Sequence, residues 1–173
     1  MQCSLVRHPQ SPVGPIEGIE ASLAASGRHW LVEYRVRGAI DAIVVPARVS
    51  EPRFTDELWR TTCFEAFVGG DGAAYTEYNF SPSGAWAAYR FADYRAETTS
   101  ICSEPPKIVT HRADDALVVT AALGPPKGTL GLSVVIEARD GSKSYWALAH
   151  PPGAPDFHHR DCFALTLPPR TRA

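Results

Sequence analysis

The sequence predicts one all-β domain, an antiparallel β-sandwich or barrel. The prediction rests on alternating strand patterns, on regularly spaced turn signals and on the composition, which includes 15 Pro and 13 Gly among 173 residues. Each proline removes a backbone donor and blocks a helix interior, so such a count disfavours a mainly helical chain. A chain of this length suits one domain and buries enough surface to fold without a disulfide or a metal. We therefore expect residues 1–173 to form a single domain.

The alternation of apolar and charged side chains is clearest in residues 30–37. Trp30, Val32, Tyr34 and Val36 would face one way and Glu33, Arg35 and Arg37 the other, which is typical of a half-buried strand. No amphipathic helical period is sustained, apart from a weak one in residues 55–60. We predict strands near residues 16–25, 29–37, 40–46, 62–68, 74–80, 85–91, 107–112, 116–123, 130–138, 144–149 and 162–167.

Turn signals separate these strands. Asp71-Gly72 and Asp140-Gly141 are strong hairpin signals, and Ser81-Pro82-Ser83-Gly84 forms another turn. Residues 102–107 are expected to be a loop between two halves of the sandwich, and residues 168–173 a loose tail.

Charge and cysteine usage limit the partners and the compartment. The 17 basic and 19 acidic residues give a net charge of −2, which disfavours nucleic acid and anionic membranes as partners. The N-terminus lacks a secretory signal pattern and no apolar run is long enough to cross a membrane, so a cytoplasmic protein is expected. Four widely spaced cysteines, Cys3, Cys63, Cys102 and Cys162, favour reduced thiols over two disulfides.

The segment from Leu58 to Arg95 holds a dense group of aromatic residues. If Ser81–Gly84 is a four-residue hairpin loop, Asn79 lies opposite Trp86, and an even loop keeps the side-chain parity of the two strands. One face would then carry both polar and aromatic side chains: Tyr75, Glu77, Asn79, Trp86 and Arg90.

Such a face suits a carbohydrate. Sugar rings present flat C–H faces to aromatic rings, and their hydroxyls bond to carboxylates, amides and guanidinium groups. The alternative is an ordinary cross-strand charge pair between Glu77 and Arg90 that Trp86 covers. Spacing alone favours this plainer interpretation.

Three blocks of sequence resemble a known family. These are L-W-x-x-T-C-F-E-x-F followed by Y-x-E-Y-N-F-S-P-S-G-x-W-A-A-Y, then S-Y-W-A-L-A-H, then P-D-F-H-H. In this order they resemble the DOMON-like proteins, which are related to family 9 carbohydrate-binding modules. The resemblance runs from about Trp30 to Leu167. It implies a jelly-roll-like β-sandwich that acts as a noncatalytic module for a small ligand, most simply a sugar.

The resemblance also implies a site. Family 9 modules hold a sugar between two tryptophans, which correspond to Trp59 and Trp146, with Glu65 six residues after the first. The register of the hairpin at residues 68–73 leaves the face of Glu65 open. The expected ligand-binding set is Trp59, Glu65, Tyr75, Asn79, Trp86, Arg90 and Trp146.

Other functions stay open. Some DOMON relatives bind haem through Met and His; Met1 is the only methionine, so haem would need His150 with His158 or His159. The same three histidines are the alternative metal ligands, although a rigid proline-rich loop explains them more simply. We expect no cofactor. Glu65 and Glu77 could form a glycosidase pair only at a suitable separation, and the aromatic face could instead dock another protein.

Overall fold

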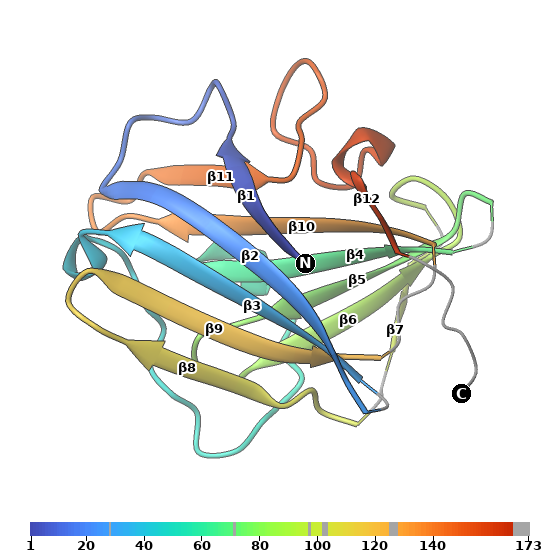
Figure 1. The fold of residues 1–173 in the computed structure, drawn as a ribbon, viewed down its shortest axis with the longest axis horizontal. Coiled ribbons are helices and arrows are strands. Elements are labelled where there is room, and N and C mark those ends of the chain that lie inside the picture. Colours follow the sequence, from blue (N-terminus) through green and yellow to red (C-terminus); the bar gives the residue numbers. More distant parts are fainter. Residues whose placement is uncertain (28, 71, 97, 102–103, 125–127, 168–173) are drawn as a thin grey trace.

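The computed structural model describes the chain except residues 28, 71, 97, 102–103, 125–127 and 168–173. The described residues form an antiparallel β-sandwich with short 3-10 turns and no α-helix, which confirms the predicted fold class (Figure 1). The described part of the chain therefore holds no helix that could cross a membrane.

Two layers make up the sandwich. One layer has the strand order β7-β6-β5-β4-β10-β11, with β12 beside β10, and the other has the order β1-β2-β3-β9-β8. β1 pairs with both β11 and β2, so it joins the layers. The strands are β1 (Gln2–Arg7), β2 (Ile16–Ser26), β3 (His29–Gly38), β4 (Cys63–Gly69), β5 (Tyr75–Phe80), β6 (Trp86–Phe91), β7 (Thr99–Ser100), β8 (Ile108–Arg112), β9 (Ala116–Leu123), β10 (Gly128–Glu137), β11 (Lys143–Ala147) and β12 (Leu165–Leu167).

The main hydrophobic core lies between the two layers. Alternate residues of β4 and β10, such as Phe64 and Val134, pack there with side chains of β2, β3 and β9. Tyr34 of β3 is fully buried, and its hydroxyl donates a hydrogen bond to the Glu65 carbonyl on β4 at 2.6 Å. Each large apolar side chain buried in this way stabilises the fold by about 1.5–3 kcal/mol.

The outer face of the β6-β5-β4-β10-β11 layer is covered as well. Phe67, Tyr75, Phe91 and Val135 form a second cluster with Phe157, Cys162 and Phe163, which belong to the segment between β11 and β12. β4 and β10 are therefore buried on both faces: β4 is buried except at Val68, and β10 is buried from Leu130 to Ile136. This covered outer face carries the candidate site.

Most predicted strands agree with the structure within two residues. The strand predicted at 40–46 is wrong: Ile40–Ala42 is a 3-10 turn (η1), and only Ile43 forms a bridge, to Ala138. The strand predicted at 162–167 is only partly present, because Arg160–Cys162 is another 3-10 turn (η3) before β12. β1 and β7 were not predicted. The weak helical period in residues 55–60 corresponds to a third 3-10 turn, η2 (Leu58–Arg60).

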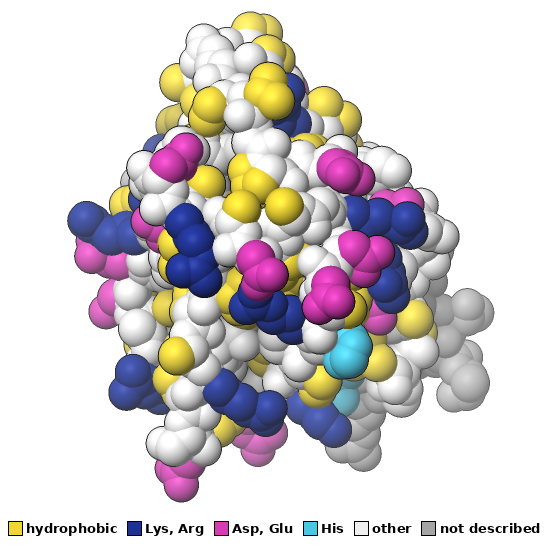
Figure 2. Space-filling view, turned by 90° about the vertical axis from the view of Figure 1, so that its left-hand side faces the viewer, with side chains coloured by type: hydrophobic (Ala, Val, Ile, Leu, Met, Phe, Trp, Pro, Cys, Tyr) yellow, Lys and Arg dark blue, Asp and Glu magenta, His cyan; other side chains and the backbone are white. Residues whose placement is uncertain are grey.

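The surface carries charges of both signs, and the described cysteines are free. Figure 2 shows acidic and basic side chains intermingled over the end of the molecule on the left of Figure 1. Cys3, Cys63 and Cys162 are free thiols. Cys102 and the predicted tail at 168–173 lie outside the described residues.

Candidate functional site

The β5–β6 hairpin has a different register from the predicted one. Phe80 pairs with Trp86 and Asn79 with Ala87, so the connection holds five residues rather than four. Within it, Ser81 donates a backbone hydrogen bond to the Ala85 carbonyl at 2.9 Å. An odd connection reverses side-chain parity. Glu77 and Asn79 therefore share a face with Ala87 and Tyr89, not with Trp86 and Arg90.

Trp86 and Arg90 consequently leave the predicted site. Trp86 is 4% exposed and packs edge-on against Phe54, with ring centres 5.5 Å apart, and its indole nitrogen has no hydrogen-bond partner among the described residues. Arg90 is exposed on the same face of the strand. The prediction that they share a face with Glu77 is wrong.

Trp146 also lies elsewhere. It pairs with Val134 on β10, and its indole is buried in the core between the layers, where its nitrogen donates to Ser144 Oγ at 3.0 Å. The predicted placement of Trp146 beside Trp59 is therefore wrong. The neighbouring side chain, Tyr145, points to the outer face instead.

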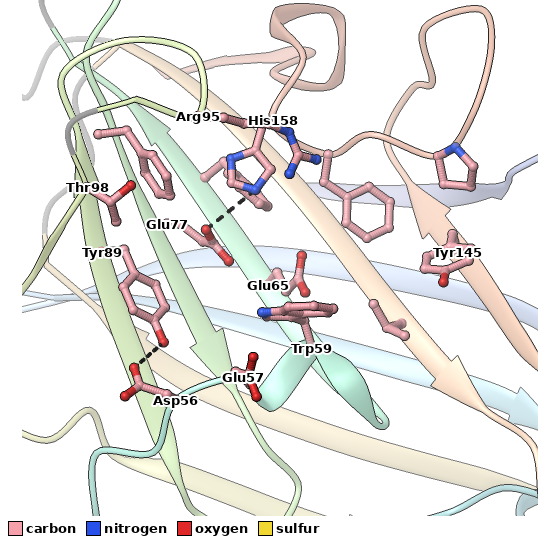
Figure 3. Close-up of a pocket in the computed structure, with 15 residues that line it drawn as sticks. Asp56, Glu57, Trp59, Glu65, Glu77, Tyr89, Arg95, Thr98, Tyr145 and His158 are labelled. Atoms are coloured by element: carbon pink, nitrogen blue, oxygen red, sulfur yellow. Dashed lines mark hydrogen bonds and ion pairs between the residues drawn. The ribbon is translucent and has the colours of Figure 1, made fainter. Parts of the chain in front are cut away.

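A cavity of about 840 Å³ opens on this outer face (Figure 3). Its floor consists of strand residues, namely Glu65, Phe67, Glu77, Tyr89, Phe91, Val135 and Tyr145. Its walls come from three connecting segments and consist of Asp56, Glu57, Trp59, Arg95, Thr98, Pro155, Phe157 and His158. The predicted residues Trp59 and Glu65 thus line one cavity.

Trp59 is presented to the cavity by η2. Leu58 is buried and anchors this turn, whereas Trp59 is 48% exposed. Glu57, just before the turn, has φ of 59°, the left-handed conformation that a non-glycine residue adopts only at a cost. The guanidinium of Arg60 lies 5.3 Å from the indole centre. The backbone thus turns sharply to place one large ring beside the carboxyl groups of the floor.

Glu65 and Glu77 form the polar part of the floor. Glu65 pairs with Asn79 across β4 and β5, and Phe67 pairs with Glu77, so the two glutamates are diagonal neighbours on one face. They are only 2% and 5% exposed. Ser133 Oγ donates to Glu65 Oε2 at 3.1 Å, and Asn79 Nδ2 donates to Glu77 Oε1 at 2.8 Å. Asn79 thus holds Glu77 from the same face of β5 and does not belong to the cavity lining.

Burial disfavours the ionised form of both carboxyl groups. It raises the pKa of Glu65 well above the ordinary value, and the negative charge of Glu77 raises it further. Burial likewise raises the pKa of Glu77, although the hydrogen bond from Asn79 opposes this shift. The pair therefore holds protons at a pH where an exposed glutamate would be ionised.

His158 covers Glu77 from the segment between β11 and β12. Burial, assisted by the charge of Arg95, lowers the pKa of His158 to about 4, so its ring is neutral at pH 7. Tyr75 Oη accepts a hydrogen bond from the Arg95 backbone N–H at 3.1 Å and lies 2.8 Å from His158 Nδ1. We therefore assign the Tyr75 hydroxyl proton to this contact and the ring proton to Nε2, which lies 3.7 Å from Glu77 Oε2. Tyr75 itself lies behind the cavity lining, stacked on Phe91.

Arg95 is held at the cavity wall by Asp156. Arg95 Nη2 and Asp156 Oδ1 are 2.8 Å apart, and the Tyr94 hydroxyl donates to Asp156 Oδ2 at 2.6 Å. Asp156 also accepts from the His158 backbone N–H at 3.1 Å. One carboxylate thus ties together two of the three connecting segments that enclose the cavity. Spacing along the chain gives no signal for this link, because its residues are about 60 positions apart.

The remaining histidines lie outside the cavity. His150 Nε2 lies 2.8 Å from the Val6 carbonyl, and its ring packs edge-on against His8. His159 Nδ1 accepts from the backbone N–H of Asp161 at 3.3 Å. Across the described residues, no group of three or more His, Cys, Asp or Glu side chains is arranged to hold a metal.

Comparison with known proteins shows a shared fold. No protein-family model and no curated protein matches this sequence. One solved structure, a candidate carbohydrate-binding protein from Bacteroides uniformis, superposes with a TM-score of 0.64 at 15% sequence identity. The match covers 96% of this chain and 84% of that one. At this identity, the likeness concerns the architecture of the whole domain.

Proposed function

We propose that this protein is a noncatalytic carbohydrate-binding module and that the outer-face cavity is its binding site. The carrying observation is the combination of an exposed indole, Trp59, with two buried carboxyl groups in one cavity. An aromatic ring stacks on the C–H face of a sugar, while carboxyl oxygens accept hydrogen bonds from its hydroxyls.

The cavity has the other features of a small-molecule site. Its volume suits a ligand of one to a few sugar rings, since such sites measure about 300–1,000 Å³. Tyr145 and Phe157 belong to the same lining and supply further apolar surface. The carbohydrate-related description of the structural neighbour supports the same ligand class.

A glycan screen followed by tryptophan fluorescence tests the proposal. Trp59 lines the cavity, whereas Trp86 and Trp146 are 4% and 5% exposed and Trp30 lies on β3 of the other layer, so a ligand in the cavity changes mainly the Trp59 emission. Trp59→Phe should therefore remove most of the fluorescence change. Chromatography of the sugar after incubation should return it unaltered.

Calorimetry measures the contribution of the ring. Trp59→Ala should weaken binding of the selected sugar about tenfold to a hundredfold, the equivalent of roughly 1.5–3 kcal/mol of lost contact. Val109→Ala is the matched control, because Val109 is 51% exposed on β8 of the other layer. Equal affinity of Trp59→Ala and the unmutated protein for every sugar in the screen would overturn the proposed site.

A further inference from the structure

The charged groups around the cavity are unevenly paired. Asp56 accepts a hydrogen bond from the Tyr89 hydroxyl at 2.8 Å, and Glu57 forms an ion pair with Arg60 at 2.7 Å. Arg95, the guanidinium in the lining, is engaged by Asp156. Within the described residues, neither Glu65 nor Glu77 forms an ion pair with an arginine or a lysine.

Both carboxyl groups also keep an oxygen free of a strong hydrogen bond. The bond from Ser133 engages Oε2 of Glu65, and the bond from Asn79 engages Oε1 of Glu77. Among the described residues, no hydrogen bond reaches Glu65 Oε1, and Glu77 Oε2 lies 3.7 Å from Nε2 of the neutral His158 ring. Figure 3 shows both carboxyl groups within the cavity.

Burying two neighbouring carboxylates is costly here, because the Arg95 guanidinium attracts both of them but forms its ion pair with Asp156. The pair lowers that cost by staying protonated, since burial raises the pKa of both carboxyl groups. A ligand that brings a positive charge to this point would be stabilised by the ionised pair. A neutral ligand at the same point would gain hydrogen bonds to the carboxyl oxygens but no charge attraction.

We propose that the cavity selects an amino sugar, whose protonated primary amine binds between Glu65 and Glu77 while its ring stacks on Trp59. This inference rests on the proposed function and specifies its ligand class. An ammonium group donates three hydrogen bonds, and two of them are satisfied by the free oxygens of the two carboxylates. Trp59 lines the same cavity, and an indole face also attracts a cation.

A sugar-borne amine fits better than a calcium ion. Calcium takes about six to eight oxygen ligands, supplied largely by carboxylates and carbonyls. Glu65 and Glu77 belong to no larger group of ligating side chains in the described part of the chain. A sugar ring would also stack on Trp59, whereas a bare ion would leave the indole without a contact.

The test compares three sugars that differ at one substituent. Calorimetry at about pH 6.5, below the pKa of roughly 7.7–8.0 expected for an α-amino group, measures D-glucosamine, N-acetyl-D-glucosamine and D-glucose. We expect D-glucosamine to bind at least tenfold more tightly than either neutral sugar, as befits hydrogen bonds to a charged group. Binding in buffers of different ionisation enthalpy should show protons released from the carboxyl pair.

Single substitutions test whether Glu65 and Glu77 cause the preference for the amino sugar. Glu65→Gln and Glu77→Gln keep the side-chain shape and remove a charge, so each should reduce the ratio of glucosamine to glucose affinity about tenfold. Glu33→Gln is the matched control, because Glu33 lies on β3 of the other layer with its side chain 42% exposed. Circular dichroism confirms that each variant is folded, and the three-sugar comparison on unmutated protein stands without them.

The outcomes separate this inference from the proposed function. Equal affinities for the three sugars would overturn the amino-sugar inference and leave carbohydrate binding in place. Displacement of D-glucosamine by calcium chloride at matched ionic strength, with no such effect of sodium chloride, would also overturn it. Failure of every sugar in the wider screen to bind would overturn both.

Discussion

Asn79 and Glu77 are joined within one strand by a hydrogen bond from Asn79 Nδ2 to Glu77 Oε1 at 2.8 Å. Both side chains are buried on the outer face of β5, and Asn79 is fully enclosed. The bond links the site to the fold, because the residue that donates to the cavity carboxyl group is itself fully buried.

Replacement of Asn79 should therefore affect stability and binding together. Asn79→Leu leaves Glu77 Oε1 without its donor and should cost about 1–3 kcal/mol of unfolding free energy, measured by urea denaturation. It should also raise the pKa of Glu77 further, since the bond from Asn79 opposes the effect of burial. Ser142→Ala, which removes an exposed hydroxyl bonded to Asp140, serves as the control and should change stability little. An unchanged urea midpoint for Asn79→Leu would contradict the assigned role.

Trp146 should be a stability residue. Its indole is buried between the layers, so Trp146→Ala should lower the unfolding free energy by about 3–5 kcal/mol. Trp146→Phe retains a ring and should lose about half as much or less. Thermal melting provides the measurement, and the sugar affinity of Trp146→Phe should stay within about twofold of the unmutated value. A large loss of affinity with unchanged melting would instead restore the role implied by the sequence resemblance.

The buried carboxyl pair should give the protein an unusual pH dependence. The folded state holds the Glu65 proton to a higher pH than the unfolded chain, whose ordinary pKa is 4.5. The contribution of Glu65 to stability is therefore fully present below pH 4.5 and is lost as the pH rises toward the folded-state pKa. His158 acts in the opposite sense, since its stabilising contribution is lost as the pH falls from 6.5 through about 4.

Glu65→Gln isolates the carboxyl contribution. The variant should gain stability relative to the unmutated protein as the pH rises above 4.5, because it has no proton to lose. Urea denaturation at a series of pH values measures the difference between the two proteins. A difference that does not grow with pH would show that Glu65 ionises normally in the folded protein.

Gly131 should control the segment that closes the cavity. A Cβ atom there would lie 3.0 Å from the Cys162 carbonyl oxygen and from a ring carbon of Phe163. Gly131→Ala should push this segment from β10, lower stability by about 1–3 kcal/mol and weaken ligand binding. Gly18→Ala is the matched control, because nothing lies within 4 Å of a Cβ at that strand position. Equal melting temperatures for the two variants would contradict the close packing of the segment.

Most of the fold could be predicted because strand alternation is a local property. The alternation at β3 follows from one buried face and one solvent-facing face, and it can be recognised without knowing which distant residues the strand contacts. β1 was missed because Leu5 is its only buried residue, so the strand has no alternating pattern of apolar side chains. The segment at 40–46 was predicted as a strand because it is apolar. Its apolar residues Ile40 and Ile43 are buried in the core, but they do not belong to a long strand.

The site was only partly predictable for a related reason. Side-chain parity alternates at every residue, so one additional residue in the β5–β6 connection moved Trp86 and Arg90 away from Glu77. The alternation of apolar and polar residues could not show which face of the layer Trp146 occupies. Its partner strand β10 is buried on both faces, and apolar residues there do not distinguish the core from the cavity.

The sequence by itself determined the all-β class, most strand positions and the presence of Trp59 and Glu65 as site candidates. The fold class and the strand positions follow from local backbone preferences, whereas Trp59 and Glu65 became candidates through the resemblance to family 9 modules. Only the tertiary structure decided that Glu65 and Glu77 are diagonal neighbours on the floor of one cavity, and that Arg95 and His158 contribute to its wall. The reason is physical: strand pairing and loop packing bring together residues far apart in sequence, and their burial then sets the charge of the site.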